Sequence, residues 1–153
     1  MAAQLPDSIV LEGERMDLYS NPLEAYWERF KKKRPNFLAV DSCKRGYIAT
    51  WEIRGAELLL KALDGNIARS SFFFWKKFIP YTVRTLFPKA NGKAIKANWF
   101  SGKLRIPRGN MTRYDHYGYN SRFEKETIIS VERGNVVKSV TLDYTNQKLV
   151  TSN

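Results

Sequence analysis

The chain is poor in the residues that build disulfides and metal sites. Its 153 residues include one cysteine, Cys43, and one histidine, His116. A single cysteine excludes an internal disulfide and fits a reducing compartment. One histidine and one cysteine cannot supply a zinc site, and the acidic residues are not spaced like those of calcium loops. We therefore expect neither a metal nor a cofactor.

Long apolar runs are also missing. No stretch approaches the roughly 18 apolar residues of a membrane-spanning helix. The N-terminus lacks the basic start and apolar run that are typical of a signal peptide. The phosphate-binding motif GxxxxGK[ST] and the nucleophile motif GxSxG are absent as well. These absences predict a cytoplasmic protein without a membrane partner, and they leave no enzyme class favoured.

Acidic residues are scarce in the middle of the chain. Residues 61–123 hold thirteen basic residues against two acidic ones, Asp64 and Asp115, whereas the two flanks balance to zero. The whole net charge of +11 therefore belongs to this middle region. Such an asymmetry concerns partners and association rates rather than the fold.

The chain is rich in hydrophobic residues, which make up 43% of it, and in aromatic ones, at 14%. A chain of this length and composition can bury a substantial core and is expected to form one domain over residues 1–153. Residues 1–7 and 146–153 are predicted to be loose ends.

The clearest local signal predicts a helix near the N-terminus. Asn21 suits the N-cap, Pro22 the first helical position and Glu24 a capping box. Apolar residues then recur at helical spacing and predict one buried face: Leu23, Tyr26, Trp27 and Phe30. The helix is expected to end at a basic run, 31–34, before Pro35.

Most of the remaining chain alternates as short strands. The predicted hairpins pair residues 47–53 with 57–63, 95–101 with 104–106, and 127–132 with 136–144. Turns are expected at residues 64–66, 107–110 and 133–135, and residues 67–88 have no clear period. The predicted class is α+β: a mainly antiparallel, strongly curled sheet or partial barrel of about seven to nine strands, with one N-terminal helix packed on it.

The segment 98–126 carries the candidate site. Arginines and tyrosines interleave there, and both residue types are enriched at interface hot spots and suit phosphate contacts. The predicted partner-binding residues are Arg105, Arg108, Arg113, Tyr114, His116, Tyr117, Tyr119 and Arg122. An ordinary solvated loop is the alternative interpretation.

His116 is the residue best suited to proton transfer at neutral pH. As a general acid or base, with Arg105, Arg108 or Arg113 holding an anion, it would suit a metal-free nuclease or phosphoesterase. A structural hydrogen bond is the simpler role, because no second acid, base or nucleophile can be paired with it from the sequence.

Two further basic clusters are candidate polyanion contacts. Trp75 precedes Lys76 and Lys77, and an aromatic ring beside cations suits base stacking. Lys31, Lys32 and Lys33 either form a solvated helix end or contribute to the same kind of face. Trp27, Trp51 and Trp99 are expected in the core.

Four segments together resemble a group of small uncharacterised bacterial proteins. They read SNPLEAYW at 20–27, GYIATWEI at 46–53, NWFSGKLRIPRG at 98–109 and YDHYGYNSRFEKE at 114–126. The resemblance covers most of the chain in the same order and implies no activity. Asn120 stands where the group tends to have Gly, and Phe123 where it tends to have Tyr.

The sequence therefore favours a non-enzymatic binding protein that holds an acidic macromolecule, most plausibly a protein, and by analogy with the group an accessory or immunity-type protein. The alternatives are RNA or DNA binding through the same surface, and a small enzyme centred on His116.

Overall fold

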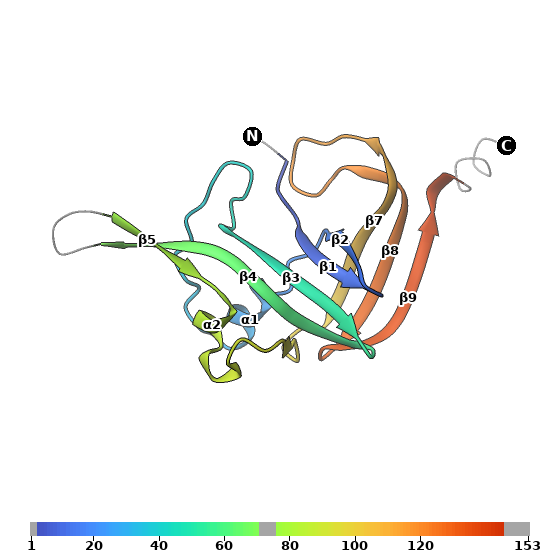
Figure 1. The fold of residues 1–153 in the computed structure, drawn as a ribbon. Coiled ribbons are helices and arrows are strands. Elements are labelled where there is room, and N and C mark those ends of the chain that lie inside the picture. Colours follow the sequence, from blue (N-terminus) through green and yellow to red (C-terminus); the bar gives the residue numbers. More distant parts are fainter. Residues whose placement is uncertain (1–2, 71–75, 146–153) are drawn as a thin grey trace.

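A computed structural model describes residues 3–70 and 76–145 (Figure 1). Within these residues one sheet contains nine strands in the order β2-β1-β3-β4-β9-β8-β7, and β5 and β6 pair with β4 outside this path. The strands are β1 (Asp7–Leu11), β2 (Glu14–Leu18), β3 (Tyr47–Arg54), β4 (Glu57–Ser70), β5 (Lys76–Tyr81), β6 (Ile95–Lys96), β7 (Gly102–Arg113), β8 (Arg122–Glu132) and β9 (Asn135–Asp143). The helices are α1 (Glu24–Arg29), α2 (Val83–Leu86) and the 3-10 turn η1 (Pro88–Ala90).

The predicted fold class is wrong. The protein is mostly sheet, and the sheet is neither closed nor strongly curled. It is mixed, because β1 pairs with β3 in parallel while the other strand pairs are antiparallel. Two short α-helices replace the single N-terminal helix. A parallel pair joins strands separated by a long connection, so local turn signals could not predict it.

β4 is the strand on which the sheet is assembled. It pairs with β3, β5, β6 and β9 over its 14 residues. The turn predicted at residues 64–66 is wrong, because β4 continues through Gly65, which lies opposite Tyr47. A Cβ on Gly65 would lie 3.0 Å from the side chains of Phe37 and Tyr47. The glycine therefore marks a close approach inside a strand rather than a turn.

The hairpin predicted between residues 95–101 and 104–106 is also wrong. β6 is two residues long and pairs with β4, whereas β7 pairs with β8. β7 continues through Pro107 and Gly109, which were expected to end it. Its register shifts between Arg108 and Met111, so these residues mark a bulge rather than a turn.

The hairpin of β8 and β9 is confirmed, with its turn at Arg133 and Gly134. The apolar side chains of β9 are not all buried, however. Val140 and Leu142 are 37% and 36% exposed. The alternation of apolar and polar residues along β9 is that of a strand with one buried face, but β9 lies at the outside of the fold.

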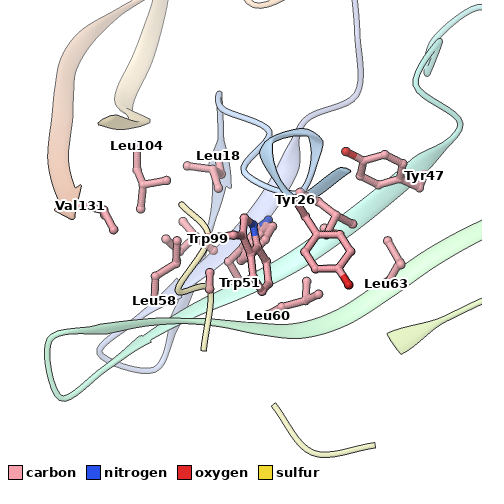
Figure 2. Packing of buried hydrophobic residues seen from close by; sticks show 14 of the residues in the cluster. Leu18, Tyr26, Tyr47, Trp51, Leu58, Leu60, Leu63, Trp99, Leu104 and Val131 are labelled. Carbon is pink, nitrogen blue, oxygen red and sulfur yellow. The ribbon is translucent and has the colours of Figure 1, made fainter. Parts of the chain in front are cut away.

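Aromatic side chains fill the core (Figure 2). Trp51 from β3 and Trp99 lie at its centre with ring centroids 6.4 Å apart, and Tyr26 from α1 meets Trp99 edge-on at 5.1 Å. Leucines of β4 and β7 surround them: Leu58, Leu60, Leu63 and Leu104. The predicted core positions of Trp27, Trp51 and Trp99 are confirmed, since each is at most 5% exposed.

α1 is shorter than predicted. Leu23 is its N-cap and makes no side-chain cap, so the predicted capping box is absent. Asn21 donates its amide to Tyr119 Oη at 3.1 Å instead. Glu24 accepts hydrogen bonds from Arg34 at 2.9 Å and from Tyr47 Oη at 2.5 Å, and these tertiary partners displace the local cap. Phe30 is 46% exposed, so the predicted stripe ends at Trp27.

The N-terminal segment expected to be loose is tied to the loop before β3 from Gln4 onward. Leu5 N–H donates to Ser42 O at 2.7 Å. Asp7 is fully buried at the start of β1, and its carboxylate accepts from Arg45, from Ala49 N–H and from Trp51 Nε1. Burial raises the pKa of the Asp7 carboxyl, and these donors oppose that shift. The outermost parts of the predicted ends, residues 1–2 and 146–153, lie outside the described residues.

Two glycines with the same backbone angle allow a matched test of close packing. Gly13 and Gly134 both have φ +80, but a Cβ at Gly134 would meet Ala97 O at 2.8 Å while Gly13 faces open space. Gly13→Ala should cost about 1–2 kcal/mol of backbone strain. Gly134→Ala should cost about 1–3 kcal/mol more, since the overlap is with backbone that cannot rotate away. Equal losses in urea unfolding would show that this contact does not constrain the fold.

Candidate functional site

The β7–β8 hairpin and the loop at its end, residues 114–121, carry the eight predicted partner-binding residues. The structure divides them. Five are exposed at the end of the hairpin and are called the hairpin tip: Arg113, Tyr114, His116, Tyr117 and Arg122. The other three, Arg105, Arg108 and Tyr119, are partly buried and bonded within the fold.

Arg105 binds the C-terminal end of the 114–121 loop to β7 and β8. Its Nε pairs with Glu126, Nη1 donates to Tyr119 O at 2.6 Å, and Nη2 donates to Ser121 O at 3.3 Å. The guanidinium also lies 5.4 Å from the centre of the Tyr19 ring. All three of its nitrogens are therefore used inside the protein. Arg105 therefore has a structural role, and its contact with a partner stays a prediction.

Tyr119 is held in the same way. Its ring stacks on Tyr19 with centroids 4.9 Å apart and planes 16° from parallel. Its hydroxyl accepts from Asn21 and donates to Leu5 O at 3.4 Å. Burial raises the pKa of Tyr119, so the phenol stays neutral. Arg108 is half-buried, with Nη1 3.4 Å from Thr127 Oγ1.

Hydrogen bonds between nearby residues determine the conformation of the loop itself. Asp115 N–H donates to Ser121 Oγ at 2.9 Å, and the Ser121 hydroxyl donates back to Asp115 O at 3.2 Å. Asp115 Oδ1 accepts from Tyr117 N–H at 2.8 Å, which is an Asx turn. These bonds fix the backbone between the two strands, so the side chains that point outward start from a defined position.

Three rings cluster at the hairpin tip. Tyr114 and Tyr117 are 61% and 59% exposed. His116 lies between them, with Nδ1 3.4 Å from Tyr114 Oη and its ring edge-on to Tyr117 at 5.7 Å. Arg113 and Arg122 are opposite each other in the β7–β8 register. No salt bridge in the described part of the chain neutralises either arginine.

The chemistry open to His116 depends on the groups around it. Within residues 3–70 and 76–145, the hydrogen-bond partner of His116 is a tyrosine hydroxyl, and the neighbouring Asp115 is occupied by backbone N–H groups. The same residues contain no group of three or more metal-ligating side chains. They include no helix long and apolar enough to cross a membrane. Among the described residues, the possible acid or base that the geometry brings to His116 is thus the Tyr114 hydroxyl.

The candidate polyanion contacts do not join the hairpin tip. Lys31, Lys32 and Lys33 are exposed after α1, where Lys32 Nζ lies 3.3 Å from Tyr26 Oη. In Figure 1, α1 lies beside α2, below the middle of β3 and β4, whereas the 114–121 loop lies at the far end of β7 and β8. Lys76 and Lys77 begin β5, on the arm that projects from the body of the sheet. Trp75 lies outside the described residues.

Sequence reasoning missed a hollow beside α1. It has a volume of about 330 Å³ and brings together residues from three separate parts of the chain: Tyr26, Phe30, Lys32, Phe87, Ile95, Lys96, Asn98 and Trp99. Phe87 stacks on Trp99 at 5.9 Å and forms its wall. Lys96 on the rim is neutralised by Glu57 at 2.9 Å. No local sequence signal marks such a site, because its lining residues meet only in the folded chain.

Comparisons of the chain with protein-family models, with curated proteins and with solved structures gave no match. The resemblance to small bacterial proteins therefore stays a prediction, and the candidate site is judged by its geometry.

The different surroundings of Arg105 and Arg113 predict stability losses of different size. Arg105→Ala should lower the free energy of unfolding by about 3 kcal/mol or more, because it leaves the buried Glu126 without its charged partner. Arg113→Ala should change it by less than about 0.5 kcal/mol, as expected for an exposed residue. Urea unfolding of both variants measures this, and a stable Arg105→Ala protein would return Arg105 to the surface candidates.

Proposed function

We propose that the protein is a non-enzymatic binding protein that holds an acidic region of another protein at the hairpin tip. The bound protein would be recognised by its carboxylates and by apolar surface that packs on the exposed tyrosine rings. An accessory or inhibitory role in bacteria would fit this mode of action.

The observation that supports the proposal most strongly is the pairing of Arg113 with Arg122 across the hairpin. Like charges directly opposite each other on neighbouring strands destabilise a sheet. Here the pair stands beside Tyr114 and Tyr117, whose rings are more than half exposed. A carboxylate bound between the two guanidinium groups would relieve the repulsion, and tyrosine and arginine are the residue types that concentrate binding energy.

A protein fits this surface better than a nucleic acid does. Nucleic-acid binding draws its affinity from many phosphate contacts along an extended basic surface. The hairpin tip supplies two arginines in a compact cluster, and the lysines at 31–33 lie elsewhere on the molecule. A compact aromatic centre with a few charges is the usual form of a protein hot spot.

The test is capture from a lysate of the source cells before and after nuclease treatment. The bait proteins are the wild type, the double variant Arg113→Glu/Arg122→Glu, and the control Lys61→Glu/Lys103→Glu, which changes the net charge equally at exposed positions elsewhere. We expect the wild type and the control to retain one protein after nuclease treatment, and the tip variant to lose it.

Loss of all capture by nuclease would contradict the proposal and favour nucleic-acid binding. That alternative also predicts oligonucleotide binding at about 50 mM salt that weakens steeply as salt rises. Equal capture by the tip variant would place the binding surface elsewhere.

A further inference from the structure

Within the described residues, β9 has an unpaired outer edge beyond its first two residues. β9 shares one register position with β4, Glu57 opposite Asn135, and Val136 N–H donates to Ala56 O at 2.9 Å just beyond it. From residue 137 to Asp143, the pairing of β9 within the described residues is with β8 alone. Figure 1 shows β9 starting beside the β3–β4 turn and then running away from β4 along the outside of the sheet.

This edge is exposed over residues 137–142. Val137 is 60% exposed, and Lys138, Ser139 and Thr141 are exposed as well. β-branched residues favour the extended backbone that an added strand would need. An open edge presents a row of backbone N–H and C=O groups, and these are complementary to another extended chain.

We propose that the β9 edge binds an extended acidic segment of the partner protein as an additional strand, an inference that rests on the proposed function. Backbone hydrogen bonds would supply affinity, and charge would select the partner. Lys138 lies on the edge itself. Arg122 of the hairpin tip begins β8, three residues before Lys125, which pairs with Asp143 at the end of β9. Asp143 is engaged by Lys125 and by Thr145 N–H, so its charge is partly compensated.

A second copy of the chain is a poorer occupant of this edge. Two copies would each carry a net charge of +11 and would repel each other as they approached. The β8–β9 register also shifts, with Val131 opposite Val136 and Ser130 opposite Lys138, so that Val137 is an extra residue. Such bulges and edge lysines are devices that prevent pairing between like sheets. An acidic strand avoids the charge penalty.

The test uses amide hydrogen exchange of the full chain with three blocked ten-residue peptides. The first alternates valine with glutamate, the second is the same peptide with alternate amides N-methylated, and the third replaces glutamate with lysine. We expect the first peptide to slow exchange in residues 137–143 by about tenfold at saturation, since it supplies acceptors for the exposed N–H groups. The other two should leave exchange there unchanged.

A matched pair of variants tests the role of charge. Lys138→Glu should weaken binding of the valine–glutamate peptide by about tenfold, whereas Lys61→Glu, an equal change in net charge on β4, should leave it within about twofold.

Three results would overturn the inference. They are unchanged exchange at residues 137–143, equal protection by the N-methylated or lysine peptide, and concentration-dependent self-protection without peptide. With any of these exchange results, the inference about β9 is wrong but the proposed function stands if the Arg113→Glu/Arg122→Glu variant still loses its captured partner. If that variant keeps its partner while residues 137–143 are protected, the proposed function fails.

Discussion

Replacing Asp7 with alanine is expected to lower the free energy of unfolding by about 3–5 kcal/mol, the range for breaking a buried ion pair. Asp7 is fully buried, and its partner Arg45 has 10% of its side chain exposed. The substitution leaves this guanidinium uncompensated and removes the acceptor of Ala49 N–H and Trp51 Nε1–H. Although burial acts to lower the pKa of Arg45, Asp7 raises it, so the arginine stays charged.

Urea unfolding of Asp7→Ala measures this loss, with the exposed Asp17→Ala on the neighbouring strand β2 as control. The control should change stability by less than about 0.5 kcal/mol. The double variant Asp7→Ala/Arg45→Leu should lose less than the sum of its two single variants, because residues in contact are coupled. A loss below about 1 kcal/mol for Asp7→Ala would show that the carboxylate does not anchor β1.

Trp27→Ala is expected to cost about 3–5 kcal/mol, the range for removing a large aromatic residue from a core. Trp27 is 5% exposed and lies between α1 and the sheet, with Phe37 and Tyr47 at 5.9 Å. Arg34 covers its other side with the guanidinium 5.5 Å from the ring. The cavity would separate the helix from the start of β3, and the surrounding rings are too constrained by one another to fill it.

Phe30→Ala is the matched control, because Phe30 belongs to the same helical turn region but is 46% exposed. Its loss should stay below about 1 kcal/mol, since most of its apolar surface is already in water. Calorimetry or chemical unfolding of the two variants measures the difference. Equal losses would mean that α1 is not anchored through Trp27.

Local patterns predicted the parts of the fold that local interactions determine. β3 alternates cleanly, and the β8–β9 turn has Gly134 where a positive φ is required. The parallel pairing of β1 with β3 and the fourteen-residue length of β4 depend on contacts between distant segments. Asp64, Gly65 and Asn66 look like a turn in the sequence, and the need to accommodate Phe37 against Gly65 becomes visible only in the folded chain.

The roles of the candidate site residues could likewise be predicted only in part. Arg113, Tyr114 and Tyr117 could be predicted as surface residues, since they lie in a polar loop between two strands or directly before it. Arg105 and Tyr119 are the same residue types and lie in the same segment, but their side chains are bonded within the fold. Their partners Glu126, Tyr19 and Asn21 come from separate segments, so no reading of residues 105–122 alone could distinguish them.

The most direct test of the hairpin tip as a binding surface is the dissociation constant of the captured partner for the wild type and for Tyr117→Ala, measured by titration calorimetry in one buffer. Tyr117 is 59% exposed and touches His116 edge-on, so its removal should hardly change the melting temperature. We predict that the dissociation constant rises by about 30-fold, which corresponds to the hot-spot threshold of about 2 kcal/mol. An unchanged dissociation constant would contradict the account.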